Sequence, residues 1–102
     1  MEKRYSQMNE QELQTEIAEL NEKAKKAEAM GMINEFSVYE RKKTMAQAYL
    51  LNPADFKPGT TYNVIGEGST FLISYLNGTF AWGYRDSAEE LEALPISLLA
   101  EK

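Results

Sequence analysis

The chain has 102 residues with 16 acidic and 11 basic side chains, a net charge of −5, and neither Cys nor His. This length is typical of one domain. The missing residue types exclude disulfides, thiol nucleophiles, Cys/His zinc sites and imidazole acid–base chemistry. No segment reaches the ~20 consecutive apolar residues that span a bilayer. We therefore expect a globular protein that is not an enzyme, carries no metal or cofactor, and does not enter a membrane.

The charges and the N-terminal residues bear on location and partners. Met1–Met8 contains charged residues, and the run of about 7 to 15 apolar residues that marks a signal peptide does not follow it. We therefore expect a cytoplasmic protein. The net negative charge repels phosphate backbones and disfavours nucleic acid, although a local basic patch would override that average.

The composition changes at Asn52-Pro53. Residues 1–52 hold one glycine and no proline, whereas residues 53–102 hold five glycines and all three prolines. The first part predicts a helical hairpin and the second a small β structure. Because about 50 residues make a marginal core, we expect residues 1–52 and 53–102 to form one cooperative unit with a shared core.

Two helices are expected in the first part. Asn9 can cap the first one with Glu12 as its capping-box partner, so this helix begins near Glu10, and Gly31 ends it after Met30. Its apolar stripe consists of Leu13, Ile17, Leu20, Ala24 and Ala27. Since this stripe suits a second copy of the chain as well as the second helix, the oligomeric state stays open.

The second helix is expected from Asn34 or Glu35 to Leu51, because Asn52-Pro53 prevents its continuation. It carries two apolar stripes, one for the first helix and one for the β part. The two stripes consist of Val38, Met45 and Tyr49, and of Tyr39, Ala46 and Leu50.

Strands are expected over residues 60–65, 70–76 and 79–85, with Asn77-Gly78 as a two-residue hairpin loop. This loop pairs Tyr75 with Phe80 and places all the large rings on one face. The rings are Phe71, Tyr75, Phe80, Trp82 and Tyr84. We interpret this face as core beneath the helices; the alternatives are a platform for bases or a peptide groove. Tyr84 and Arg85 end the strand and are the most accessible.

The segment Ala93–Leu99 resembles the point in SH3-like barrels where a strand ends at Pro, makes one helical turn and enters the last strand. Trp82–Arg85 is similar to the central strand of such barrels. The Ala-Leu-Tyr-Asp-Tyr segment, the acidic loop and the paired Trp of peptide-binding SH3 domains are missing. The resemblance therefore implies architecture and not proline-rich ligand binding.

Taken whole, the chain resembles the YfhH-like family of small uncharacterised proteins from Bacillus-type bacteria. The resemblance implies an α+β fold, with an N-terminal antiparallel α-hairpin packed on a C-terminal small SH3-like β-barrel. The family has no established activity, so no functional residue is carried over. The segments that carry the resemblance are Met1–Met8, Tyr39–Lys42, Tyr75–Gly78, Phe80–Arg85 and Ala93–Leu99.

Basic residues gather in the predicted hairpin, because a turn near Met32 places position 23 level with position 41. They are Lys23, Lys25, Lys26, Arg41, Lys42 and Lys43. This cluster is either a site for phosphate or an acidic partner, or a solvated surface paired with neighbouring glutamates. Lys42 falls between the two stripes of its helix, where its charge must snorkel to solvent or find a buried partner.

The leading hypothesis is a non-catalytic binding or adaptor protein with a protein partner. The alternative is an accessory module in nucleic-acid transactions that uses the basic patch. A small-molecule enzyme or sensor would need a deep polar pocket. The acidic loop at residues 86–92 lacks the ligand pattern of a Ca²⁺ loop and is expected to be solvated. The predicted partner-binding residues are Tyr39, Arg41, Lys42, Lys43, Trp82, Tyr84 and Arg85.

Overall fold

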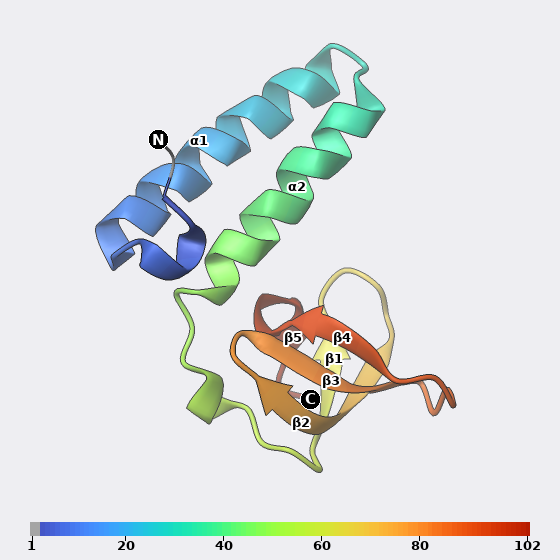
Figure 1. Ribbon diagram of the computed structural model, residues 1–102. Coiled ribbons are helices and arrows are strands. Elements are labelled where there is room, and N and C mark those ends of the chain that lie inside the picture. The colour runs from blue at the N-terminus through green and yellow to red at the C-terminus, as the bar shows by residue number, and fades with distance from the viewer. Residues whose placement is uncertain (1–2) are drawn as a thin grey trace. The chain divides into compact units, whose positions relative to one another are not determined.

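A computed structural model describes residues 3–102 and divides into two compact units (Figure 1). The helical unit extends to Leu50, and the β unit comprises Leu51–Lys102. The division lies just before the composition change at Asn52-Pro53. The shared core between the two parts stays a prediction.

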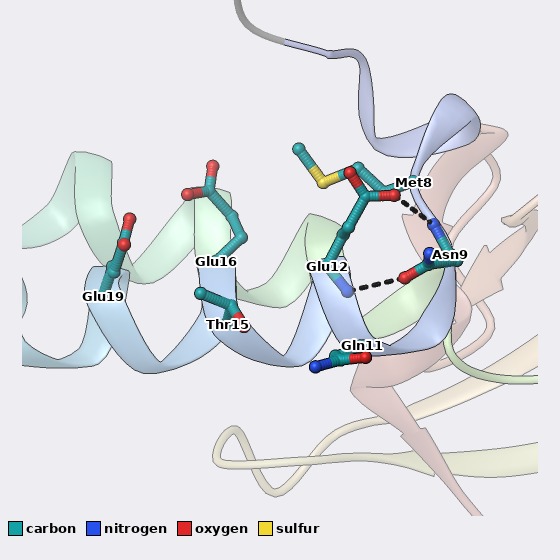
Figure 2. Close-up of a pocket in the computed structure, with 7 residues that line it drawn as sticks. All are labelled: Met8, Asn9, Gln11, Glu12, Thr15, Glu16 and Glu19. Carbon is teal, nitrogen blue, oxygen red and sulfur yellow. Dashed lines mark hydrogen bonds between the residues drawn. The ribbon is translucent and has the colours of Figure 1, made fainter.

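The helical unit contains the short 3-10 helix η1 (Tyr5–Gln7) and the helices α1 (Glu10–Ala29) and α2 (Ile33–Ala48). The predicted capping box is confirmed, because Asn9 Oδ1 accepts from the Glu12 amide at 2.8 Å and Glu12 Oε1 accepts from the Asn9 amide at 3.1 Å (Figure 2). Gly31 follows α1 with a φ of +72°, a backbone conformation that favours glycine.

The predicted end of the second helix at Leu51 is wrong, because α2 ends at Ala48. The amides of Tyr49 and Leu50 donate to carbonyls only three residues back, at 3.2 and 3.0 Å. This tightening closes the last turn before Asn52-Pro53 is reached.

α1 and α2 pack against each other through a core dominated by small side chains. Lys43 Nζ on α2 donates to Asn21 Oδ1 on α1 at 3.4 Å, which places position 23 level with position 41, as predicted. Alanines at the interface let the two backbones approach closely. The buried apolar residues of this unit are Leu13, Leu20, Ala24, Ala27, Ala46 and Ala48.

The β unit begins with η2 (Pro53–Asp55) and continues with an antiparallel five-stranded sheet in the order β4-β3-β2-β1-β5. The strands are β1 (Thr61–Val64), β2 (Thr70–Asn77), β3 (Phe80–Arg85), β4 (Glu92–Pro95) and β5 (Leu99–Ala100). These elements confirm the α+β class. The predicted passage from Pro95 through a helical turn into the last strand is also confirmed, by η3 (Ile96–Leu98). β4 and β5 are the edges of an open sheet, so closure into a barrel stays a prediction.

The predicted register of the β2–β3 hairpin is wrong. The loop is Gly78-Thr79, because Asn77 pairs with Phe80 and Tyr75 pairs with Trp82. Gly78 has a φ of +60°, and Thr79 is not among the residues with positive φ. Glycine at the first loop position is typical of type II′ hairpins, whereas a loop of Asn77-Gly78 would be typical of type I′.

The structure also differs from the predicted register at Ser74, where a bulge shifts the pairing between Ile73 and Tyr75. An extra residue reverses the side-chain alternation beyond it. Phe71 and Ile73 are therefore fully buried, while Tyr75 points to the opposite face and is 45% exposed. The prediction of one face carrying all the large rings is wrong, because Phe71 belongs to the core and the other rings do not share its face.

One face of the sheet, together with η3, supplies the core of the β unit. Gly83 lies on this face opposite Ile73, where a Cβ atom would come within 1.9 Å of the Leu72 carbonyl oxygen. Only glycine fits this close backbone approach. The buried apolar residues are Tyr62, Val64, Phe71, Ile73, Ala81, Leu94, Ile96 and Leu99.

Candidate functional site

The helical unit contains a cavity of about 410 Å³, which we call the hairpin groove. The N-terminal segment, α1 and α2 all contribute to it. Four of its side chains are basic and two are acidic, so the groove has an excess of positive charge on a protein with a net charge of −5. It is lined by Lys3, Arg4, Tyr5, Glu16, Glu19, Leu20, Lys23, Tyr39 and Lys42.

Helical spacing places the groove residues of each helix side by side. Lys23 follows Leu20 by three positions on α1, and Lys42 follows Tyr39 by three positions on α2. Lys42 is exposed, which agrees with the first of its two predicted alternatives, a charge that snorkels to solvent. Neither Lys23 nor Lys42 forms an ion pair with another residue of the described range 3–102. These two ammonium groups are therefore available to an incoming anion.

The N-terminal segment reaches the groove because an ion pair attaches it to α1. Lys3 Nζ lies 2.8 Å from Glu12 Oε2. The Arg4 amide donates to Gln7 Oε1 at 3.2 Å, which shapes η1. The hydrogen bond from Lys3, followed by the amide of Asn9, lowers the pKa of Glu12 below its ordinary value. Glu12 thus stays ionised at neutral pH and keeps Lys3 in place.

Apolar surface continues from the groove through Tyr39. A depression of about 300 Å³ beside Ala27 and Met30 also includes Tyr39, and so does one of about 290 Å³ beside Val38 and Lys42. Met30 is 64% exposed and Val38 is 46% exposed. The groove therefore offers cations and apolar contacts together.

The predicted cluster of six cations lies at one level but is divided between different sides of the helices. Lys43 Nζ pairs with Glu40 Oε2 at 2.8 Å and contacts Asn21. Arg41 and Lys25 are exposed and do not line the groove. Successive positions on a helix turn by about 100°, so residues 41, 42 and 43 cannot share one side.

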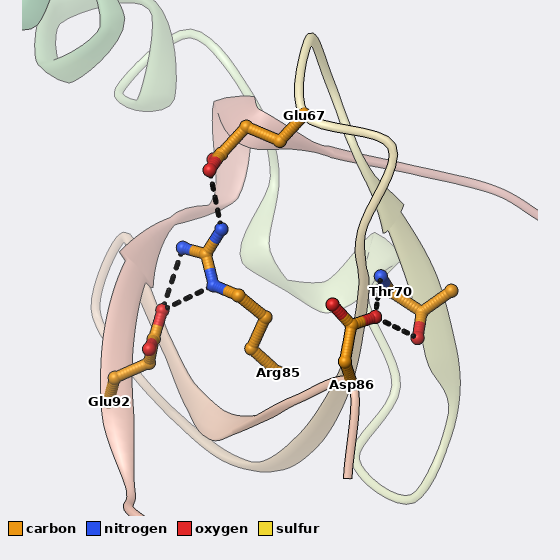
Figure 3. A network of polar contacts seen from close by, with 5 residues as sticks. All are labelled: Glu67, Thr70, Arg85, Asp86 and Glu92. Carbon is orange, nitrogen blue, oxygen red and sulfur yellow. Dashed lines mark hydrogen bonds and ion pairs between the residues drawn. The ribbon is translucent and has the colours of Figure 1, made fainter. Parts of the chain in front are cut away.

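Arg85 in the β unit is occupied by carboxylates of its own unit (Figure 3). Its Nη1 atom lies 2.6 Å from Glu67 Oε1, and its Nη2 and Nε atoms lie 2.8 and 3.0 Å from Glu92 Oε1. The hydrogen bonds that Arg85 donates to Glu92, and then to Glu67, raise the pKa of Arg85. Arg85 acts as a link between β3, β4 and the β1–β2 loop, and its charge is balanced internally.

Asp86 follows directly and is held by Thr70. Its Oδ1 atom accepts from the Thr70 amide at 2.8 Å and from the Thr70 hydroxyl at 3.1 Å. The amide hydrogen bond is the largest cause of the lowered pKa of Asp86. Asp86 and Glu92, the two ends of the predicted acidic loop, therefore both bond to residues of the sheet.

Trp82 and Tyr84 lie on the side of the sheet opposite the core. Trp82 stacks on Tyr75, with ring centroids 5.9 Å apart and an interplanar angle of 4°. We call this side the outer ring face. It comprises Leu72, Tyr75, Phe80, Trp82 and Tyr84.

Neither the acidic depression along α1 nor any cluster of metal-ligating side chains forms a further site in residues 3–102. A depression of about 340 Å³ along α1 is lined partly by Glu12, Glu16 and Glu19, but Glu12 and Asn9 serve the capping box there (Figure 2). The described residues contain no group of three or more His, Cys, Asp or Glu side chains arranged for a metal ion. None of the described helices combines the length and the apolar character that crossing a bilayer requires.

An α-helical hairpin followed by an antiparallel sheet defines a small α+β protein, and the chain belongs to the family described as "Protein of unknown function (DUF1811)", whose model matches residues 3–100. The chain is 65% identical over 103 aligned residues to the "Uncharacterized protein YfhH" of Bacillus subtilis (strain 168). The match covers 100% of this chain and 99% of that protein. The family resemblance inferred from the sequence is confirmed.

Proposed function

We propose that the protein is a non-catalytic, cytoplasmic binding protein whose hairpin groove docks an acidic segment of a partner protein. The observation that carries this proposal is the local excess of positive charge around a cavity of about 410 Å³. Complementary charge steers such a partner and selects against wrong ones.

Two features of the groove favour a peptide segment over a bare anion. Lys23 and Lys42 have no ion pair within the described part of the chain, so docking forms new pairs without breaking old ones. Met30, Val38 and Tyr39 supply apolar surface next to these charges. A segment with acidic and apolar side chains matches both features.

Nucleic acid is the second candidate, because the same cations suit phosphate groups. The net charge of −5 opposes a long polyanion, whereas a short acidic segment needs only the local field. The protein partner is therefore the better match.

We further infer that the sheet of the β unit is curled as in SH3-like barrels. The buried strand residues of that unit share one face, and such a face has to be covered. Curling lets the sheet cover itself, with η3 at one end. A solution structure with contacts between β4 and β5 side chains would support this inference, and a flat sheet would contradict it.

Photo-crosslinking in cells tests the docking site. A photoreactive residue at Tyr39 should give a discrete crosslinked protein, and one at the exposed Ser37 should not, because these positions point to different sides of α2. Lys23→Glu combined with Lys42→Glu should abolish the product. Lys25→Glu combined with Arg41→Glu makes the same charge change away from the groove and should preserve it.

Mobility shifts with DNA and RNA at low salt separate the second candidate. If the wild-type protein shifts the nucleic acid and the Lys23→Glu and Lys42→Glu double variant does not, nucleic acid is the ligand of the groove and the protein-partner proposal is wrong. A crosslink that survives this double reversal, or forms equally from Ser37, would contradict the groove as the docking site.

A further inference from the structure

The outer ring face of the β unit is a continuous surface across neighbouring strands. Residues directly opposite each other in a ladder share one face. Leu72 is opposite Tyr84, and Trp82 is opposite both Tyr75 on β2 and Ala93 on β4. Leu72 and Tyr75 are 42% and 45% exposed. The other rings are half-buried, which leaves part of their surface accessible.

The stacked rings present their π faces in a defined geometry. An angle of 4° and a centroid distance of 5.9 Å describe an offset stack of Tyr75 and Trp82. The face of an aromatic ring carries partial negative charge and attracts cations, with Trp the strongest and Arg the most frequent partner. Rings that are ordered in advance lose little entropy when a ligand binds.

The described strand residues of the outer ring face carry no charge of their own. Asp86 is held by Thr70 next to the end of the ring row, and these hydrogen bonds lower its pKa so that it stays ionised. The β unit has few cations, and Arg85 among them is already paired with Glu67 and Glu92. A cation is the ligand that complements both the rings and the carboxylate.

We propose that the outer ring face binds an extended, arginine- or lysine-containing segment of a partner protein, at a site separate from the hairpin groove. The aliphatic stems lie against Leu72 and the rings, and the charged ends face the rings and Asp86. A nucleic acid would find stacking surface here, but no unpaired cation on this face for its phosphates. This inference does not depend on the proposed function of the groove.

Trp82 provides a direct test because it is the only tryptophan in the chain. A short peptide of alternating Gly and Arg should change its fluorescence saturably, and the effect should weaken as salt is added. A matched Gly-Glu peptide and oligo(dT) should give no saturable change. No response to the Arg peptide, or an equal response to either control, would overturn the proposal.

Substitutions at Leu72 sharpen the test with little risk to the fold, since this side chain is exposed. Leu72→Lys should weaken binding of the Arg peptide, and Leu72→Glu should strengthen it. Tyr75→Leu should weaken binding about fivefold, the loss expected for one exposed cation–π contact. Tyr49→Leu removes an exposed tyrosine from the helical unit and should have no effect.

Two results would show that the peptide binds elsewhere. Leu72→Lys and Leu72→Glu variants with equal affinities would contradict the site. So would loss of binding in the Lys23→Glu and Lys42→Glu double variant, which changes only the hairpin groove. Circular dichroism of each variant confirms that it is folded.

Discussion

Lys23 and Lys42 of the helical unit and Arg85 of the β unit are partnered in opposite ways. Lys23 and Lys42 line the hairpin groove, and neither has a carboxylate within 4.0 Å among the described residues. Arg85 is bound by two carboxylates and cross-links its own sheet. The helical unit therefore displays two basic side chains without ion pairs, while the β unit displays aromatic rings. The net charge of the chain describes neither surface.

The same two units differ in how they fill their interiors. The helical unit relies on alanines where its helices approach, whereas the β unit buries Phe71 and Ile73 completely. In the sheet, the backbones of β2 and β3 approach each other closely at Gly83. A larger side chain at Ala24 or at Gly83 should therefore lower the free energy of unfolding. The loss should be larger at Gly83, because backbone atoms cannot move aside as side chains can.

Gly83→Ala should have the largest effect on stability. Its methyl group would lie 1.9 Å from the Leu72 carbonyl oxygen, so the paired strands must separate. We expect a loss of about 3 kcal/mol or more in the free energy of unfolding, measured by urea titration of Trp82 fluorescence. Ser74→Ala, at an exposed position of the neighbouring strand, should stay within about 0.5 kcal/mol of wild type. Equal stability of the two variants would contradict the close approach.

Ala24→Leu is the corresponding change in the helical unit. Ala24 is 2% exposed, and the larger side chain should cost about 1–3 kcal/mol because the helices must shift. If the two units share a core, helix loss by circular dichroism and the Trp82 transition should move together. Transitions at different urea concentrations would show that the units unfold separately.

Asn9→Ala should cost about 1 kcal/mol, because the side chain that accepts from the Glu12 amide is lost. Asn9→Asp keeps an accepting oxygen and should restore most of this stability. Thermal unfolding followed at a helical wavelength measures both. If Asn9→Asp loses as much stability as Asn9→Ala, the Asn9 cap does not stabilise α1.

Asp86→Asn should have the smallest effect, a slight loss of stability at neutral pH that disappears in acid. The folded-state pKa of Asp86 is lowered, so its stabilisation is complete above the unfolded-state pKa and disappears as pH falls through the folded value. The variant should show a shallower loss of stability between about pH 5 and pH 2. Glu89→Gln, in the same exposed loop, serves as the control and should leave that slope unchanged.

Local signals in the sequence were sufficient for much of the fold. The Asn9–Glu12 capping box, Gly31 and the Pro95 turn each depend on a few adjacent residues, so their chemistry can be recognised without the partner strands. The choice between Asn77-Gly78 and Gly78-Thr79 loops depends on the whole ladder, and the bulge at Ser74 has no comparable local signal.

The hairpin groove was predictable only in part. Helical spacing and the turn near Met32 brought Lys23 and Lys42 to one level. Lys3 and Arg4 join them only because the N-terminal segment folds back through the Lys3–Glu12 ion pair, a contact across nine positions that no periodicity encodes. The division of Lys42 from Lys43 follows from helix geometry and was available from the sequence.

The bulge at Ser74 decides which side chains beyond it lie on the outer ring face. Beyond this residue the alternation is reversed, so Tyr75 is displayed and Leu76 lies on the side of the buried Ala81. Deleting Ser74 would leave Ile73 opposite Gly83 and Tyr75 opposite Trp82, so Tyr75 and Leu76 would keep their faces and only the bulge would be lost. If β2 instead kept Ser74 and paired without a bulge, Tyr75 would turn to the core side and Leu76 would be displayed.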